Sequence, residues 1–311
     1  MRIAVSGVAE RDLPDYRAAA DGAEIVRAAD RAEADALAAE VDAVVGGVSS
    51  AAIVASATVR WVHSPAAGVD GLLTPGLVQK GIDVTSATGN GGIPLAEQAL
   101  MLMLMLDRDA PRWLRAQQRG EWDRFEHGEL YGTTVGLIGL GTAGAHLARL
   151  LTAAGVHVRG LRRRPGLPVD GVESVVGQDR LHEFLADCDW VVVTAPSTPE
   201  TAGMLDAAAL AAMKRGARLV CVSRGGIVDD EALLSALDSG HLGGAGLDAH
   251  GVEPLPSESR FWSHPAVIAT PHNGATTAAT AARGRAIALD NVRRFVSGEP
   301  LRNLVDLRAG Y

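Results

Sequence analysis

The chain has 311 residues, of which 47% are hydrophobic and 21% are charged, a composition typical of a globular protein large enough for two domains. Its formal net charge of −8 argues against a nucleic-acid partner, which needs a basic surface. No apolar stretch reaches the roughly 20 residues of a membrane-spanning helix. Cys188 and Cys221 lie in or beside apolar, strand-like runs. We therefore expect a cytoplasmic protein with reduced core cysteines, no metal cluster and no membrane contact.

Short apolar runs alternate with alanine-rich segments of helical propensity from Arg2 to about Thr88. This alternation predicts βα units and a parallel sheet, with strands at 3–5, 41–45, 61–63 and 82–85. Ligands of open α/β sheets bind at the loops that follow the carboxyl ends of the strands. Gly46-Gly47 and the segment 64–70, which contains Ala67 and Gly68, are therefore candidate substrate-binding loops. A plain turn is an equal alternative for Gly46-Gly47.

The middle and end of the chain continue the same pattern. Residues 94–120 are expected to form a long helical region that starts near Pro94 and ends at Gly120. Its apolar stretch 95–106 is expected to be a helix buried on most sides. Further strands are expected at 156–161, 190–194, 218–223, 244–248 and 267–270, with helices at 199–213, 230–240 and 276–297. Together with a strand before residue 139, this set is large enough for a complete dinucleotide-binding domain.

A glycine-rich turn lies between these two halves, in the stretch 133–149. An apolar run ends at Gly139, and helical spacing follows Gly144, which predicts a strand, a tight turn and a helix. Gly139, Gly141 and Gly144 fit the pattern G-x-G-x-x-G, in which the second glycine lets the backbone approach a pyrophosphate. The unpaired N–H groups at the start of the helix then bind the phosphate. The context favours dinucleotide binding over an ordinary βα turn.

The whole pattern predicts an α/β fold with two domains, each built on a doubly wound parallel sheet. We expect a flavodoxin-like substrate-binding domain at 1–93 and 285–311, and a Rossmann dinucleotide-binding domain at 94–284. The substrate-binding domain is discontinuous because the last segment is apolar enough to dock onto the N-terminal part.

The residue at the end of the second strand of a Rossmann fold selects the cofactor, because an acid binds the ribose hydroxyls and an arginine accommodates a 2′-phosphate. Arg162 holds that place here, Arg163 and Arg164 follow it, and no acid is near. The sequence therefore predicts NADP(H) over NAD(H), although arginines on an exposed loop can also be merely solvated.

Three ionisable residues follow the ends of later strands. Arg224 directly follows the strand 218–223, Glu253 follows the strand 244–248, and His272 follows the strand 267–270. The carboxyl ends of parallel strands meet at one edge of a sheet, which is also where the glycine turn lies. We therefore expect the three side chains to lie near the bound cofactor.

These residues and their surroundings resemble the D-2-hydroxyacid dehydrogenase family, and the resemblance covers essentially the whole chain. It is carried by Gly139-Leu140-Gly141-Thr142-Ala143-Gly144, Ala195-Pro196-Ser197-Thr198-Pro199-Glu200-Thr201, Ser223-Arg224-Gly225-Gly226-Ile227-Val228-Asp229, Glu253-Pro254 and Pro271-His272-Asn273-Gly274. The resemblance implies a two-domain NAD(P)-dependent enzyme with Arg224, Glu253 and His272 as its catalytic residues. It also implies a homodimer joined through the cofactor domain.

The same resemblance implies further contacts. Cofactor contacts are expected at Thr142, Ala143, Ala195, Pro196, Val222, Ser223, Asp248 and Gly274, and the backbone at Ala67 and Gly68 is expected to bind the substrate carboxylate. Trp122 and Phe125 align loosely with aromatics that reach the partner subunit's site in some relatives, but core or interface packing is the favoured role. The family's His-Ile-Gly-Gly is here His272-Asn273-Gly274-Ala275, a departure that bears on contacts with the nicotinamide.

The chemistry of a 2-oxo acid matches these residue types. A guanidinium offers a planar fork of donors that can bind both the carboxylate and the ketone. The ketone oxygen needs a proton when a hydride reaches its carbon, and histidine is suited to proton donation near neutral pH. A carboxylate such as Glu253 favours the protonated form of His272.

We therefore expect a reductase of small 2-oxo acids, with glyoxylate and hydroxypyruvate as first candidates. Small residues at 46–48 leave bulkier substrates such as phenylpyruvate open, and a phosphoglycerate-dehydrogenase-like role also stays open. Glu253 disfavours a formate-dehydrogenase-like enzyme, because glutamine stands there in those relatives. A non-catalytic, nucleotide-sensing protein of the corepressor type is the alternative from a different functional class, since such relatives keep a similar set of residues.

Overall fold

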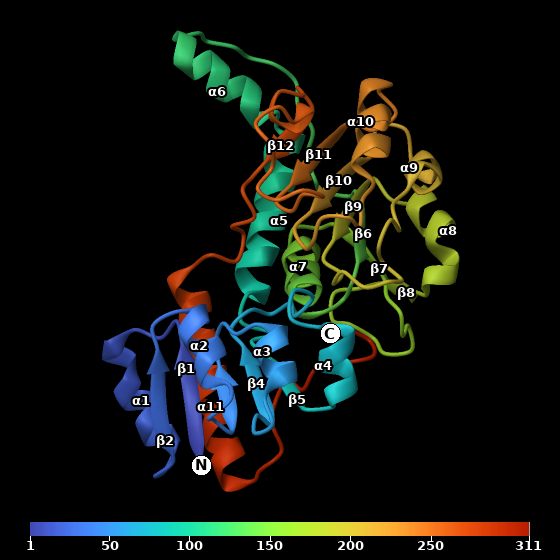
Figure 1. The fold of residues 1–311 in the computed structure, drawn as a ribbon. Coiled ribbons are helices and arrows are strands. Elements are labelled where there is room, and N and C mark those ends of the chain that lie inside the picture. Colours follow the sequence, from blue (N-terminus) through green and yellow to red (C-terminus); the bar gives the residue numbers. More distant parts are fainter. Residues whose placement is uncertain (311) are drawn as a thin grey trace. The chain divides into compact units, whose positions relative to one another are not determined.

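The computed structural model describes residues 1–310 and divides into two units (Figure 1). Unit 1 comprises Met1–Asn90 and the segment from Thr277 onward, and unit 2 comprises Gly91–Thr276. The chain thus returns to unit 1 at residue 277, earlier than the expected residue 285. The Thr277 side chain accepts a hydrogen bond from the backbone N–H of Thr280 and so caps helix α11 (Ala278–Ser297). Because the helix begins at this cap, the boundary falls before the helix and not within it, and the whole of α11 belongs to unit 1.

Unit 1 is built on a five-stranded, fully parallel sheet with the order β2-β1-β3-β4-β5. Its strands are β1 (Arg2–Ser6), β2 (Glu24–Ala28), β3 (Ala43–Val45), β4 (Trp61–Ser64) and β5 (Asp83–Ser86). Its helices are α1 (Leu13–Ala19), α2 (Arg31–Leu37), α3 (Ser50–Ala55), α4 (Pro75–Lys80) and α11. This strand order is that of flavodoxin-like folds. The sequence missed β2, because this edge strand contains the exposed residues Glu24 and Arg27.

Alternate residues of the unit 1 strands face two apolar layers, as expected for a sheet covered on both faces. On one face Ile3 and Trp61 pack in a cluster with Ala288 and Val292 of α11. On the other face the strands pack against a cluster that includes Ile53 of α3 and Leu77 of α4.

Unit 2 is built on a seven-stranded parallel sheet with the order β12-β11-β10-β9-β6-β7-β8. Its strands are β6 (Thr134–Ile138), β7 (His157–Leu161), β8 (Ser174–Val176), β9 (Trp190–Val193), β10 (Arg218–Cys221), β11 (Gly244–Leu247) and β12 (Val267–Ala269). The order reverses between β6 and β9, the Rossmann topology, in which ligands bind at the reversal. The prediction of two doubly wound parallel sheets is thereby confirmed.

The helices of unit 2 cover both faces of this sheet. α5 (Gly92–Asp107) and α7 (Thr142–Ala153) contribute Leu102 and Leu147 to one apolar cluster. α8 (Leu181–Ala186), α9 (Ala207–Ala212) and α10 (Asp230–Asp238) contribute Phe184, Leu210 and Leu233 to the other.

Two expected helical regions of unit 2 differ in detail from the structure. The region 94–120 is helical but divided into α5 and α6 (Ala110–Arg119), because Asp109 adopts a left-handed conformation with φ 49° and Pro111 follows it. Proline lacks the N–H that would continue the first helix. The expected helix at 199–213 is only α9, since the preceding residues form turns held by Thr198 and Thr201 hydrogen bonds.

Both cysteines are unpaired and buried, and burial raises the pKa of the Cys188 thiol to about 12. Across residues 1–310, no helix is long and apolar enough to span a membrane. The same residues contain no cluster of His, Cys, Asp or Glu side chains that could hold a metal ion.

His63 of β4 links the stability of unit 1 to pH. The ring is 1% exposed, and burial lowers the pKa of His63 to about 4 from an ordinary value of 6.5. The folded protein keeps the ring neutral, whereas the unfolded chain takes up a proton as the pH falls below 6.5. The free energy of unfolding is therefore unaffected by His63 above pH 6.5. It falls as the pH drops from 6.5 toward 4, by ~3 kcal/mol in all.

Urea unfolding between about pH 7.5 and 4 tests this expectation. The wild-type protein should lose stability over the acid range more steeply than His63→Gln, which has no proton to take up. Equal slopes for the two proteins would show that His63 does not couple folding to pH.

Candidate active site

The predicted glycine turn joins β6 to α7 at the reversal of the unit 2 sheet. A Cβ at Gly139 would lie 2.6 Å from the Ala195 backbone nitrogen, and a Cβ at Gly144 would clash with the Gly139 carbonyl oxygen. A Cβ at Gly141, in contrast, would meet nothing within 4 Å. The first and third glycines therefore allow close packing, and the second leaves open space beside the backbone.

The open space adjoins the N-terminus of α7. Gly141 is the N-cap residue, and no side chain among residues 1–310 caps the helix. The first N–H groups and the positive end of the helix dipole thus have no side-chain acceptor and suit an anion. The predicted contact residues Thr142 and Ala143 form this first turn, and Ala195 and Pro196 follow the neighbouring strand β9. This arrangement fits a dinucleotide pyrophosphate.

The loop after β7 carries the three predicted cofactor-selecting arginines. The Arg162 guanidinium donates a hydrogen bond to the Leu167 carbonyl oxygen, which folds the loop back on itself. Arg163 and Arg164 are exposed. A hydrogen bond from Thr198 and, more weakly, the charge of Arg163 lower the pKa of Glu200. No residue between 159 and 169 is acidic, so the loop presents positive charge where many Rossmann folds have a carboxylate.

The three predicted catalytic residues lie at the same edge of the unit 2 sheet. Arg224, Glu253 and His272 follow β10, β11 and β12, which are parallel neighbours in the sheet. A Cβ at Gly225 would clash with the His250 carbonyl oxygen. Glycine at that position therefore lets the loop after β10 pass directly against the loop after β11.

Glu253 and His272 are hydrogen-bonded to each other. His272 Nδ1 lies 2.8 and 2.9 Å from the two carboxylate oxygens of Glu253, and the two side chains are 35% and 37% exposed. A carboxylate only accepts hydrogen bonds, so Nδ1 carries the proton that faces it. The second ring nitrogen, Nε2, is then the one that can exchange a proton with a substrate.

The surroundings of Glu253 favour its ionised form. Burial raises the pKa of Glu253, but hydrogen bonds from the His250 backbone N–H, at 2.9 Å, and from His272 outweigh burial and lower it below its ordinary value. The carboxylate that fixes the histidine ring thus remains charged at neutral pH.

Asp248 and Gly274, both predicted to contact the cofactor, bond to each other. Asp248 is fully buried, and its Oδ2 accepts the Gly274 N–H at 2.9 Å. Its Oδ1 accepts the Thr270 hydroxyl at 2.6 Å and the Asn273 N–H at 3.1 Å. Asp248 thus fastens the loop that carries His272. The remaining predicted contacts, Val222 and Ser223, are buried residues that follow β10.

Sequence reasoning assigned no role to two members of this network. Thr270 directly follows β12, and Gln98 of α5 donates a hydrogen bond from Nε2 to Thr270 Oγ1 at 3.0 Å. The one feature of the sequence that could have indicated a role for Gln98 is that this polar residue lies inside the apolar run 95–106.

The predicted substrate loops belong to unit 1. Gly47 follows β3, next to the reversal of strand order between β1 and β3, and a Cβ there would meet nothing within 4 Å. Ala67 and Gly68 follow β4, and the Thr88 hydroxyl donates a hydrogen bond to the Ala67 carbonyl oxygen at 3.1 Å. These loops thus lie at the carboxyl edge of the unit 1 sheet.

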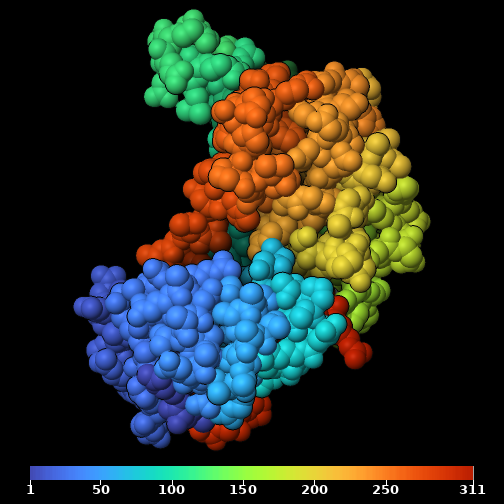
Figure 2. Space-filling view, viewed as in Figure 1, coloured from blue at the N-terminus to red at the C-terminus, as the bar shows by residue number. Residues whose placement is uncertain are grey.

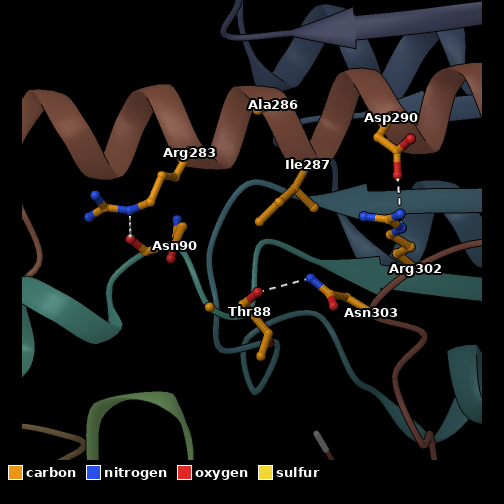
Figure 3. A pocket seen from close by; sticks show the side chains of 9 residues that line it. Thr88, Asn90, Arg283, Ala286, Ile287, Asp290, Arg302 and Asn303 are labelled. Atoms are coloured by element: carbon orange, nitrogen blue, oxygen red, sulfur yellow. Dashed lines mark hydrogen bonds and ion pairs between the residues drawn. The ribbon is translucent and has the colours of Figure 1, made fainter. Parts of the chain in front are cut away.

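Figure 3 shows a pocket of about 430 Å³ within unit 1, beyond the end of β5. Arg283 Nε donates to the Asn90 carbonyl oxygen at 2.6 Å, and Asn303 Nδ2 donates to the Thr88 carbonyl oxygen at 2.9 Å. The pocket is lined by Thr88, Gly89, Asn90, Arg283, Ala286, Ile287, Asp290, Arg302 and Asn303. None of the predicted substrate residues lines this pocket.

Comparison with known proteins decides the family. Residues 100–274 match the model of the D-isomer specific 2-hydroxyacid dehydrogenase, NAD binding domain. The chain belongs to this family. The segment matched by the dehydrogenase model lies within unit 2 and contains Arg224, Glu253 and His272.

Curated dehydrogenases of the family resemble the chain at similar levels. D-3-phosphoglycerate dehydrogenase of Bacillus subtilis is 34% identical over 255 residues, which are 81% of this chain and 48% of that protein. Glyoxylate/hydroxypyruvate reductase A of Serratia proteamaculans is 33% identical over 258 residues, 81% of this chain and 82% of that protein. The chain spans about half the length of the phosphoglycerate dehydrogenases that it matches.

Two solved structures of dehydrogenases match nearly the whole chain. One is a D-isomer specific 2-hydroxyacid dehydrogenase from Xanthobacter autotrophicus in complex with NADPH and MES, at 33% identity, TM-score 0.83 and 99% coverage of both chains. The other is an NADPH-dependent glyoxylate/hydroxypyruvate reductase from Sinorhizobium meliloti in complex with NADP and sulfate. Its identity is 31%, its TM-score is 0.85, and the match covers 100% of this chain and 99% of that one.

Proposed function

We propose that this protein is an NAD(P)-dependent oxidoreductase that reduces a small 2-oxo acid, such as glyoxylate or hydroxypyruvate, to the D-2-hydroxy acid. The observation that carries the proposal is the Glu253–His272 pair at 2.8 Å, which lies at the same carboxyl edge of the unit 2 sheet as Arg224. The uncapped α7 N-terminus lies at the same edge. The named activities of relatives that match most of the chain support the substrate class.

Each catalytic side chain has a distinct role in this proposal. The bound nicotinamide supplies the hydride in reduction and accepts it in oxidation. Arg224 binds the substrate carboxylate and ketone through its planar fork of donors and stabilises the charge that develops on the ketone oxygen. His272 donates a proton to that oxygen from Nε2, and Glu253 stabilises the protonated ring. In oxidation His272 accepts the proton.

The proposed binding residues in unit 1 act through the backbone. Ala67 and Gly68 offer N–H groups to the substrate carboxylate, and Gly47 borders the substrate without a side chain. Their positions after β4 and β3 support this assignment, because ligands of open α/β sheets bind at such loops. The absence of a side chain at residue 47 leaves room for a bulkier substrate such as phenylpyruvate.

A panel of 2-oxo acids, assayed with NADPH and with NADH by loss of cofactor absorbance, tests the function. Turnover of glyoxylate or hydroxypyruvate supports the proposal, and preferred turnover of phenylpyruvate moves it to bulkier acids. Oxidation of D-3-phosphoglycerate would favour the function named for the phosphoglycerate dehydrogenase relatives. Cofactor binding without turnover of any of these acids would favour a nucleotide-sensing protein of the corepressor type.

We also propose that NADP(H) is the preferred cofactor. The arginines after β7 support this preference, as do the NADPH and NADP complexes of two similar structures. Replacing Arg162 and Arg163 together by serine removes the donors for a 2′-phosphate. We expect kcat/KM for NADPH to fall about 10- to 100-fold, because hydrogen bonds to a charged group are strong.

The same double substitution should leave kcat/KM for NADH within about twofold, since NADH has no 2′-phosphate. Arg215→Ser, at an exposed position outside this loop, is the matched control and should change neither value. An equal loss with both cofactors, or a wild-type preference for NADH, would contradict the proposed selectivity.

We further propose a homodimer formed through α6 and the segment that follows it. Figure 2 shows this part of unit 2, in green, standing away from the remainder of the unit. Trp113, Leu114 and Trp122 are 41%, 52% and 91% exposed, a concentration of apolar surface that favours a protein partner. Trp122 is thus no core residue, whereas Phe125 packs on Arg112, whose guanidinium carbon is 4.0 Å from the ring centroid.

Light scattering after gel filtration should give twice the chain mass, and a monomer would contradict the proposed dimer.

We also propose a cytoplasmic location, in which the two buried cysteines remain reduced.

A further inference from the structure

Gln98 is a polar side chain on a face of α5 that packs into unit 2. Gln98 is half-buried, and Pro94 and Leu102, one turn before and after it on the helix, are buried. A partly buried amide costs less when it is hydrogen-bonded. Gln98 Nε2 lies 3.0 Å from Thr270 Oγ1 and 3.4 Å from Asp248 Oδ1, so its partners lie directly beside the loop that carries His272.

Thr270 connects Gln98 to that loop. Its hydroxyl donates to Asp248 Oδ1 at 2.6 Å, because a carboxylate only accepts, and so it accepts the hydrogen bond from Gln98. Its carbonyl oxygen accepts the His272 N–H at 3.0 Å and His250 Nε2 at 2.9 Å. The hydroxyl and the carbonyl oxygen of Thr270 therefore both bond to the loop that carries His272 or to residues that contact this loop.

The backbone around His272 is in a conformation that needs such support. His272 has φ 50°, in the left-handed region, which costs an L-residue other than Asn or Gly about 1 kcal/mol or more. The N–H groups of His272, Asn273 and Gly274 donate in turn to Thr270 O, Asp248 Oδ1 and Asp248 Oδ2. These three bonds stabilise the turn that directs the ring toward Glu253.

Gln98 also packs against this turn. A Cβ at Gly274 would lie 2.9 Å from Gln98 Cγ and 2.7 Å from Asp248 Oδ2. The backbone of the loop thus approaches α5 as closely as glycine allows. A change in the Gln98 side chain therefore acts on the loop through both hydrogen bonding and contact.

We propose that Gln98 is a positioning residue for proton transfer at His272. Its amide holds the Thr270 hydroxyl and the Asp248 carboxylate in place, and these two groups hold the left-handed turn that keeps the imidazole against Glu253. This inference rests on the proposed function for its kinetic consequence. The arrangement of the loop itself does not depend on which 2-oxo acid is the substrate.

Two substitutions of similar size separate positioning from mere packing. Gln98→Met keeps the volume and removes the donor, and Gln98→Glu replaces the donor by a carboxylate that repels Asp248. We expect kcat to fall at least about tenfold for both variants at neutral pH, because a small displacement of a catalytic group is costly. KM for the 2-oxo acid should stay within about twofold, since Gln98 does not contact the substrate in this proposal.

The pH profile gives a readout that a packing role would not move. Asp248 Oδ1 lies 3.4 Å from the Gln98 amide, His250 and His272 donate to the Thr270 carbonyl oxygen, and Glu253 pairs with His272, so these four are the ionisable groups of the network. When the introduced carboxyl of Gln98→Glu is protonated it can donate a hydrogen bond again, so its kcat relative to wild type should rise as the pH falls from 8 toward 5. Gln98→Met should show no such recovery, and Gln79→Met, at an exposed position on α4, should behave as wild type.

Nitrogen-15 spectra of the histidine rings in ligand-free protein test the geometry without turnover. Wild type should give one His272 ring signal set with a protonated Nδ1, and Gln98→Met should lose or split it. A kcat within twofold of wild type in both variants, with an unchanged His272 signal, would overturn the inference. If the wild type is inactive on 2-oxo acids but Gln98→Met alters its His272 signal, the proposed reduction is refuted. The proposal that Gln98 positions the His272 ring is then supported.

Discussion

Replacing His272 by asparagine should lower the rate of 2-oxo acid reduction about 10²- to 10⁴-fold, the usual contribution of a positioned proton donor. Asparagine is the better choice than alanine because it tolerates the left-handed conformation that His272 adopts at φ 50°. The loop should therefore keep its shape while the ring and its proton are lost. Steady-state kinetics with NADPH measure the effect, and cofactor affinity measured by fluorescence titration should barely change.

His157 offers a matched control for this experiment. Its Nδ1 pairs with Glu173 at 2.7 Å, a histidine–glutamate pair like that of His272, but both side chains are 58% exposed. His157→Asn should leave turnover unchanged, because an exposed ion pair contributes little. Unchanged turnover in His272→Asn would remove His272 from its proposed role.

Replacing Arg224 by lysine should lower kcat/KM for the 2-oxo acid about 10²- to 10³-fold, even though the positive charge is kept. A lysine ammonium is a single point of charge and cannot bind the carboxylate and the ketone through one planar fork. We expect KM to rise and kcat to fall together, because the guanidinium binds the substrate and also stabilises the charge of the transition state.

Arg180→Lys is the control for the arginine substitution. Arg180 forms an exposed pair with Glu183 at 2.7 Å, and its replacement should leave both constants within about twofold. Retention of wild-type kcat/KM by Arg224→Lys would show that charge alone suffices at residue 224 and would contradict two-point binding.

Much of the fold was readable from local pattern. Buried parallel strands are continuous apolar runs, so β4, β9 and β10 were visible as such. Edge strands β2 and β8 were missed because half of each faces solvent and their sequences carry Glu24, Arg27 and Ser174. The break between α5 and α6 was missed because the apolar and polar residues of 94–120 keep helical spacing across Asp109.

The members of the candidate site were predictable to different degrees. Arg224 and His272 stand immediately after strand ends, and Glu253 follows another within a few residues, so chain order alone placed them on one edge of the sheet. The Glu253–His272 hydrogen bond and the ionisation of Glu253 depend on how the loops after β11 and β12 fold. Sequence spacing carries no information about such contacts.

The sequence by itself determined the parallel α/β architecture, the glycine turn before α7 and the order of the ionisable strand-end residues, because each is a local property of consecutive residues. The tertiary structure decided that Gln98, more than 170 residues before His272, adjoins the catalytic loop. It also decided that Asp248 is wholly buried and bonded to that loop. Hydrogen bonds between distant segments exist only once the sheet has brought the strand ends together, so no periodicity or motif in the chain reports them.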